Sequence, residues 1–249
     1  MIVKDAAMTT IDLHRTHSPV AIPTLGSLGA SGNLAQPAKV ALVSAAAAVP
    51  PITMLHLNAT AAVDAASWTI SDYVVTLPYG IPLFGMTAAA LAIGGGMLAR
   101  GLAQVTGTRV LRGLLAAWAI ALLIAAIFPT NLRGTPENFS SNVHLYAGAV
   151  VFAALPAAGV LLARRQRRLT GRTAMTVVLT AISALNVLLS TALILNRLPG
   201  VIGMPELMLP PGILQRAAGA VEIVLLAVAA AAVLRSAHRS GSSSAAVAH

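Results

Sequence analysis

Residues 129–146, PTNLRGTPENFSSNVHLY, form the longest clearly polar break in an otherwise apolar sequence. One apolar run, residues 110–128, ends at the front of this break, and a second, residues 145–163, begins at its back. Each run has about the length of a helix that crosses a bilayer, roughly 20 residues. The break is therefore predicted to be a loop between two membrane helices, lying at the membrane surface.

The composition of the whole chain supports this prediction. Of its 249 residues, 57% are hydrophobic and 9% are charged, with a mean hydropathy of +0.82. A soluble domain carries about 25% charged residues, so we predict an integral membrane protein. The chain has no cysteine, which excludes disulfides, thiolate metal sites and cysteine nucleophiles.

Six apolar runs divide the chain. They are continuously apolar and do not alternate as the strands of a membrane barrel do, and they span residues 39–57, 79–99, 110–128, 145–163, 173–195 and 213–234. The predicted fold is all-α, a polytopic six-transmembrane-helix bundle over residues 38–235. Residues 1–37 are predicted to be a mobile cytoplasmic tail, because they are polar and lack periodicity. Residues 236–249 are predicted to be a flexible cytoplasmic tail.

The basic residues predict an orientation. Thirteen of the sixteen Lys and Arg residues lie in the tails and in the second and fourth connections between runs. The positive-inside rule then places both termini in the cytoplasm. The loop from Arg164 to Arg172 is predicted to contact anionic lipid. The net charge of +9 is explained by this topology, and no nucleic-acid partner is predicted.

Glu222 is the most informative single residue. It lies about nine residues into the sixth run, roughly 14 Å deep at 1.5 Å per residue. A carboxyl at that depth is expected to face the bundle interior and to mark function. Its alternative role is that of a protonated residue that hydrogen-bonds for packing. Gln215 and Gly219 share its helix face, whereas Arg216 lies about 120° away around the helix.

Other polar residues form a weaker set of candidates. Asn186 shares a face with Ser183 and Ser190 in the fifth run, where such residues commonly join helices by hydrogen bonds; the alternative is that it partners Glu222. His144 opens the fourth run and is a candidate proton relay. Asp72 either caps a helix or reaches His144.

Known catalytic motifs are missing from the sequence. Ser140-x-x-x-His144 resembles the Ser/His part of membrane zinc hydrolases of the alkaline ceramidase type, but the paired histidines that those enzymes carry late in the chain are absent. No catalytic residue, metal site or cofactor is therefore predicted. In the first long loop, Trp68 and Tyr73 predict a segment that lies at the membrane interface.

Several short pieces together resemble a known family. They are Ile70-Ser71-Asp72-Tyr73, Phe128-Pro129-Thr130-Asn131, His144, and Gly212-Ile213-Leu214-Gln215-Arg216 followed by Glu222. Their order and spacing resemble the bacterial six-helix membrane family catalogued as domain of unknown function 998, over residues 39–235. That family often has an acid where this chain has Asn131. The resemblance implies six membrane helices and an inner-membrane location, and it implies no activity.

The sequence leaves three functions open. The favoured one is a membrane protein that binds or transports a small molecule or lipid through a polar site near the outer face, with Asp72, Tyr73, Asn131, His144, Asn186, Gln215, Arg216 and Glu222 as candidate residues. A structural or assembly subunit without catalysis is the first alternative. A lipid hydrolase at the outer surface is the second, so the sequence favours a protein that is not an enzyme. It identifies no protein partner.

Overall fold

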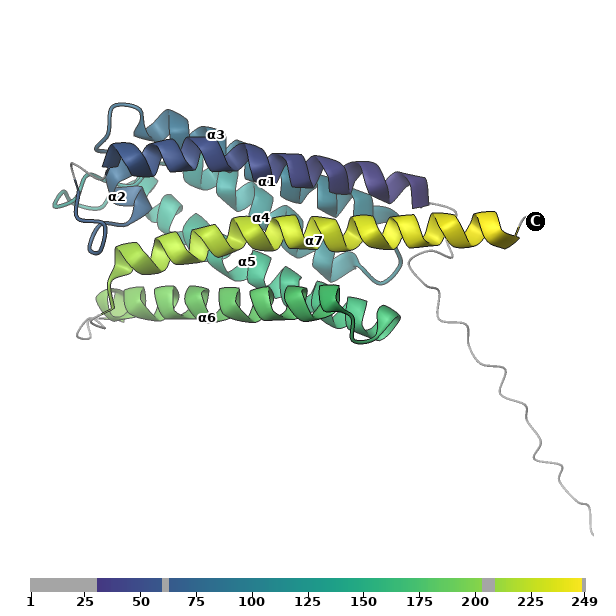
Figure 1. The fold of residues 1–249 in the computed structure, drawn as a ribbon. Helices are drawn as coiled ribbons and strands as arrows, with labels where there is room; N and C mark the ends of the chain where they lie inside the picture. The colour runs from purple at the N-terminus through teal and green to yellow at the C-terminus, as the bar shows by residue number, and fades with distance from the viewer. Residues whose placement is uncertain (1–30, 60–62, 203–208, 248–249) are drawn as a thin grey trace, which may run out of the picture.

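The computed structural model describes residues 31–59, 63–202 and 209–247, and helices make up most of these ranges (Figure 1). Six long helices dominate them: α1 (Ser31–Ala59), α3 (Gly80–Gly101), α4 (Arg109–Ile127), α5 (Phe139–Thr170), α6 (Ala174–Ile202) and α7 (Pro211–Val247). Two short elements lie between them, helix α2 (Ile70–Val74) and the 3₁₀ turn η1 (Leu102–Gln104).

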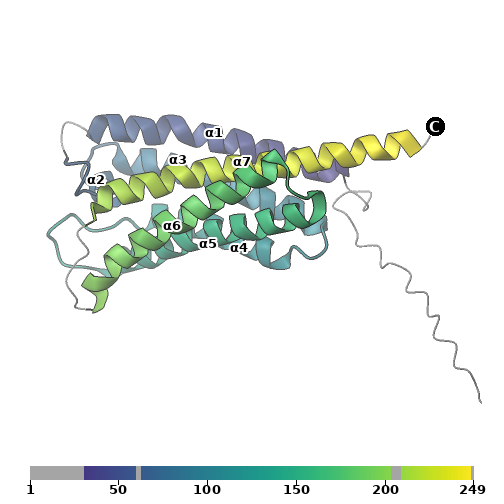
Figure 2. The same cartoon turned by 60° about the horizontal axis from the view of Figure 1, so that its bottom comes forward.

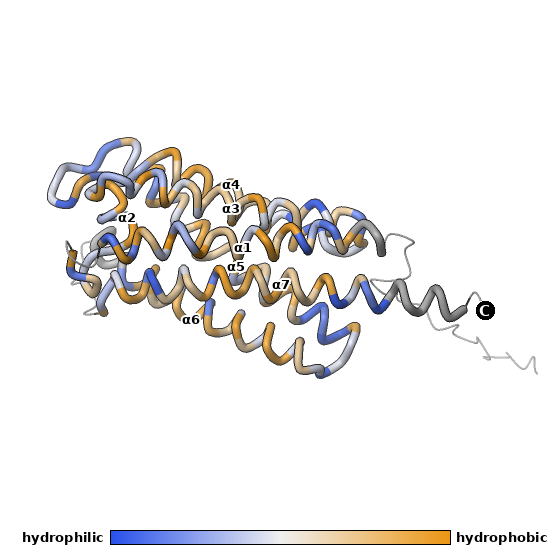
Figure 3. The backbone as a smooth tube through the Cα atoms, turned by 45° about the horizontal axis from the view of Figure 1, so that its top comes forward, coloured by the Kyte–Doolittle hydropathy of each residue, from blue (hydrophilic) through white to orange (hydrophobic). Residues whose placement is uncertain are grey.

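The six long helices are long and apolar enough to cross a membrane, as the sequence predicted. Hydrophobic residues occupy the middle stretches of the helices, and hydrophilic residues gather toward the loops at the two ends (Figure 3). Large apolar side chains also face outward, among them Val43, Ile127 and Leu188. A surface of this kind is stable only against lipid or another apolar partner, so the chain is a multi-pass membrane protein.

Helix boundaries differ from those of the apolar runs. α1 starts at Ser31, within the predicted tail, and α7 continues to Val247 through the predicted C-terminal tail. α5 starts after Asn138, whose side chain caps it, and stops at Gly171, which has a φ of 69°. Caps and breakers end a helix, whereas hydropathy marks only the part within lipid. The remaining predicted tail residues, 1–30 and 248–249, lie outside the described ranges.

The long helices form a closed ring in chain order. Each packs against the next, and α7 closes the ring against α1 while also touching α5 and α3. Figure 1 shows α7 between α1 and α6, and Figure 2 shows α6 running obliquely across α5. We call the end with α2 and residues 129–138 the α2 end, and the end with Arg100, Arg109 and residues 164–173 the arginine end.

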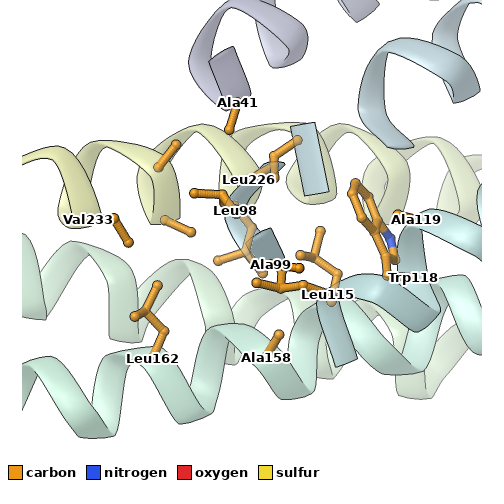
Figure 4. Close-up of a cluster of buried hydrophobic side chains, with 14 of the residues drawn as sticks. Ala41, Leu98, Ala99, Leu115, Trp118, Ala119, Ala158, Leu162, Leu226 and Val233 are labelled. Atoms are coloured by element: carbon orange, nitrogen blue, oxygen red, sulfur yellow. The ribbon is translucent and has the colours of Figure 1, made fainter. Parts of the chain in front are cut away.

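Small residues let these helices approach closely. Ala38, Ala41, Ala45 and Ala48 are buried on one face of α1. A Cβ atom built on Gly94 of α3 would lie 3.4 Å from the Ala41 carbonyl oxygen and 3.0 Å from Leu226 of α7. The absence of a side chain at Gly94 therefore lets α3 approach α1 and α7 closely. Larger side chains, including Leu98, Leu115, Leu162 and Trp118, fill the space between the helices (Figure 4).

Candidate functional site

Polar side chains gather at two levels of the bundle. One level surrounds α2, and the other lies inside the ring around Glu222.

Helix α2 has only five residues and is held by its own N-terminal cap. The Thr69 hydroxyl accepts from the Asp72 backbone N–H, and the Asp72 carboxylate accepts from the Thr69 N–H at 2.8 Å and from its hydroxyl at 2.7 Å. This reciprocal arrangement satisfies two backbone donors that the helix leaves free. Asp72 thus fills the capping role that was one of its two predicted roles.

A directed chain of hydrogen bonds joins α2 to α5 and α7. His144 Nδ1 lies 2.9 Å from the carbonyl oxygens of Ala125 and Phe128, which only accept, so Nδ1 carries the hydrogen. In the neutral ring, Nε2 then accepts from the Ser71 hydroxyl at 3.1 Å. Gln215 Nε2 donates to the same Ser71 oxygen at 3.4 Å, and its Oε1 accepts the Ile70 backbone N–H.

This chain of bonds bears on the predicted pairing of Asp72 with His144. The histidine contacts Ser71, the residue next to Asp72, while the Asp72 carboxylate turns back to Thr69. Neighbouring residues on a helix point about 100° apart. Asp72 of α2 and His144 of α5 therefore both lie at the α2 end but take different partners.

Tyr73, from the segment that is predicted to lie at the membrane interface, has its side chain fully buried in the protein. Its hydroxyl hydrogen-bonds His56 Nδ1 of α1 at 3.0 Å, and the Arg216 guanidinium lies 5.0 Å above its ring. Burial raises the pKa of Tyr73 to about 12, against the opposing effect of the nearby Arg216 charge. The neutral phenol thus anchors α2 to α1.

Arg216 holds the segment before α2. Its Nη1 donates to the backbone carbonyls of Ala65 and Trp68, the latter at 2.9 Å. The start of α7 comes so close to this segment that a Cβ on Gly212 would lie 2.3 Å from the Trp68 carbonyl oxygen. Arg216 therefore points toward the α2 end, as predicted, and there it binds backbone.

Asn131 serves the loop that contains it. Its Nδ2 donates to the Pro136 carbonyl, and the Ser140 hydroxyl donates to the Pro129 carbonyl at 2.7 Å. Asn138 and Ser141 cap α5 reciprocally. The predicted loop at 129–146 is thus a loop only as far as Asn138, where it folds on its own backbone, and its remaining residues form the first turns of α5. The Ser140 hydroxyl bonds the loop backbone.

Glu222 lies inside the ring and is 3% exposed, as predicted for a residue that faces the bundle. Trp118 Nε1 of α4 donates to Glu222 Oε2 at 3.4 Å. The other carboxyl oxygen, Oε1, is buried and has no hydrogen-bond partner in the described structure. Trp118 is itself pressed against α3, since a Cβ on Gly95 would lie 2.8 Å from its ring. Figure 4 shows the Trp118 ring among the buried apolar side chains.

Asn186 lies on the inward face of α6 with Ser183 and Ser190, and all three are buried, as predicted. The Ser190 hydroxyl donates to Asn186 Oδ1 at 3.2 Å, whereas Asn186 Nδ2 has no partner in the described structure. The Ser183 hydroxyl bonds the Leu179 carbonyl one turn back.

The close contacts around Gly159 place Asn186 and Glu222 at one level. A Cβ on Gly159 of α5 would meet both Ser183 of α6 and Leu225 of α7. α6 and α7 run in opposite directions, so one turn toward the α2 end leads from Ser183 to Asn186 and from Leu225 to Glu222. An unpartnered amide hydrogen donor and an unpartnered carboxyl oxygen therefore occur at the same depth in the ring.

The sequence did not identify Trp118, His56 or Ser71 as members of these clusters. Trp118 stands in an apolar run like any core residue, and its partner is 104 positions away. Tyr73 and His56 are 17 positions apart, across a loop. Among the described residues, no three His, Cys, Asp or Glu side chains are grouped so that they could hold a metal ion.

The fold and the buried polar residues define a multi-pass α-helical membrane protein with a polar centre inside its helix ring. The family model described as "Protein of unknown function (DUF998)" matches residues 42–232, and the chain belongs to this family. The match includes every candidate site residue from Asp72 to Glu222. No curated protein and no solved structure matches the chain.

Proposed function

We propose that this protein binds a small molecule, or the polar part of a lipid, inside the helix ring and moves it across the membrane. The observation that carries the proposal is the Glu222 carboxyl, which is buried in the bundle with a single hydrogen bond, from Trp118. A buried polar oxygen without a partner costs about 1–3 kcal/mol. A ligand that donates a hydrogen bond to Glu222 Oε1 would offset this cost.

The polar residues at the α2 end support a different role, that of a fixed cover over the bundle. Gln215, Arg216 and His144 each bond backbone or side-chain atoms of the segment around α2. Ser140 and Asp72, which a hydrolase would need together with His144, are engaged in loop and cap hydrogen bonds. The geometry therefore gives a lipid hydrolase less support than it gives a binding protein.

The distribution of charge supports a location and an orientation for this activity. With both termini in the cytoplasm of a bacterial cell, the arginine end faces the anionic inner leaflet of the plasma membrane, and α2 covers the outer face. Reporter fusions after Arg168 and after Asn138 are expected to report cytoplasm and exterior respectively. The opposite result at either site would contradict the orientation.

Native mass spectrometry of the protein purified in detergent tests the binding function. We expect a non-covalently bound species on the wild-type protein that is lost from Glu222→Leu. It should be kept by the matched control Thr87→Val, whose hydroxyl only bonds the Leu83 carbonyl of its own helix. Equal occupancy of the wild-type protein and Glu222→Leu, or an empty wild-type protein, would contradict the proposal.

A further inference from the structure

The inward face of α6 carries a row of buried, mostly polar residues, which helix packing alone does not require. Among the side chains of α6 that the structure describes, those up to Asn196, every buried one follows a spacing of three or four residues, in the order Thr176, Leu179, Ser183, Asn186, Ser190, Leu193 and Asn196. Five of these seven are polar, although most of the residues of α6 are apolar. At 1.5 Å per residue, the row is about 30 Å long, which is the thickness of the hydrocarbon core.

Polar atoms without partners occur along this row. Asn186 Nδ2 and Asn196 Oδ1 are buried and unpartnered in the described structure, and Glu222 Oε1 lies at the level of Asn186. Nearby in α5, Pro156 lacks the N–H that would bond the Phe152 carbonyl. Helix packing is served by satisfied polar groups, so these atoms point to a mobile hydrogen-bonding species.

The row also has two apolar interruptions. Leu179 separates Thr176 from the central group of Ser183, Asn186 and Ser190, and Leu193 separates that group from Asn196. Both leucines are buried in the helix ring. An apolar side chain across a polar path closes it to water until it moves. The arrangement therefore has a polar centre that can be closed from either end.

Glu222 is the only acidic residue in the six candidate membrane spans. The described ionisable side chains of the helices around it belong to residues near the helix ends, namely Lys39 and His56 in α1, Arg100 in α3, Arg109 and Arg112 in α4, His144, Tyr146 and the arginines from Arg164 onward in α5, and Arg216, Arg235, His238 and Arg239 in α7. A carboxyl in this position has no fixed countercharge beside it, so a proton is the cation it can hold at low cost.

We propose that the inward face of α6, together with Glu222, is a gated water-accessible pathway for protons. Water enters past Leu193 or Leu179 and reaches Ser190, Asn186 and Ser183, where Glu222 Oε1 takes up or releases the proton. This pathway rests on the proposed function, in which Glu222 takes part in binding the transported molecule. It identifies the proton as the ion that accompanies that molecule. It needs no redox partner, because a proton only moves between water and a carboxylate.

Cysteine labelling in the full-length protein tests the pathway directly. The chain has no native cysteine, so each of the single substitutions Ser183→Cys and Ser190→Cys introduces the only thiol in the protein. No native cysteine has to be removed first. The thiolate, and not the thiol, attacks the sulfur of methanethiosulfonate ethylsulfonate, a water-soluble charged reagent, and displaces methanesulfinate. A labelled position has therefore released a proton to water. The matched control is Leu188→Cys on the same helix, at a position that is 66% exposed toward the surroundings of the bundle.

In vesicles of phosphatidylethanolamine and phosphatidylglycerol, with reagent on both sides, we expect both serine-site variants to react at least tenfold faster than Leu188→Cys. The rates should rise about tenfold per pH unit below the thiol pKa. A lipid-soluble maleimide should modify Leu188→Cys, showing that its thiol is intact. Adding Leu193→Ala or Leu179→Ala to Ser190→Cys should accelerate the reaction several-fold, because each removes one apolar barrier.

Rates for Ser183→Cys and Ser190→Cys no higher than that for Leu188→Cys would overturn the pathway. Because Ser→Cys is nearly isosteric, loss of folding is not expected, and co-elution with the wild-type protein in gel filtration checks it. The outcome is independent of native mass spectrometry. Unlabelled serine sites with a Glu222-dependent bound species would leave the proposed function standing and reject only the proton pathway.

Discussion

The adjacent glycines Gly95 and Gly96 of α3 allow a sharp test of how the bundle holds Glu222. A Cβ on Gly95 would lie 2.8 Å and 2.9 Å from two carbon atoms of the Trp118 ring, whereas a Cβ on Gly96 would meet no atom within 4 Å. Both substitutions to alanine gain the same helix propensity, about 1 kcal/mol. Their difference in unfolding free energy therefore isolates the clash with Trp118.

The expected size of that difference follows from overpacking. Forcing an extra methyl group into a packed site costs about 1–3 kcal/mol. The Trp118 ring can relieve the clash only by moving, which puts at risk its hydrogen bond to Glu222, worth about 1 kcal/mol. We expect Gly96→Ala to be as stable as the wild-type protein or up to about 1 kcal/mol more stable. We expect Gly95→Ala to be about 1–3 kcal/mol less stable than Gly96→Ala.

Reversible unfolding in mixed micelles of dodecyl maltoside and sodium dodecyl sulfate, followed by far-ultraviolet circular dichroism, measures both variants. Repeating the pair in a Trp118→Ala background is the control, because removal of the ring should abolish the difference. If Gly95→Ala and Gly96→Ala differ by less than about 0.5 kcal/mol, or if the difference survives in Trp118→Ala, the reasoning about this contact is refuted.

Three further predictions concern the two polar levels. Because the raised pKa of Tyr73, about 12, exceeds its ordinary value of 10.0, its stabilising contribution is complete below pH 10 and is lost as the pH rises toward 12; a plot of stability against pH from 9 to 12 should be flatter for Tyr73→Phe. Gln215→Leu removes the acceptor of the Ile70 N–H, so chymotrypsin should cleave the α2 segment several-fold faster than in the wild-type protein. Equal cleavage rates would contradict the conclusion that Gln215 holds α2 in place. Glu222→Gln should fold like the wild-type protein. A thermal-unfolding midpoint several degrees lower than that of the wild-type protein would contradict this prediction.

The membrane spans were predictable because hydropathy over about 20 residues is a strong signal. The helix ends were not, since they depend on local caps. α5 begins at the reciprocal cap of Asn138 and Ser141, six residues before the apolar run, and polar residues such as Gln166 continue it beyond the run. A window of hydropathy contains no information about such hydrogen bonds.

The burial of Glu222 and Asn186 was predictable for a similar reason, because a polar side chain facing lipid has no partners. The identity of their partners was not predictable. Trp118 meets Glu222 only through the rotation of α4 about its axis, which the sequence does not specify. The α2 region shows the same limit. Asp72 was expected either to cap a helix or to reach His144; it caps α2, and the adjacent residue Ser71 contacts the histidine instead.

The side chains around α2 and those inside the ring differ in how completely their hydrogen bonds are satisfied, although Asn131 Oδ1 in the loop at the α2 end is also buried without a partner. At the α2 end, Asp72 and Gln215 each have partners that hold backbone in place. Inside the ring, Glu222 and Asn186 each keep one atom without a partner. A leucine at position 222 would fill similar space without the cost of burying a carboxyl. It would, however, leave the buried Trp118 Nε1 donor without its acceptor. Stability therefore accounts for Glu222 Oε2, which accepts that bond, whereas the reason for the unpartnered Oε1 has to be sought in what it binds.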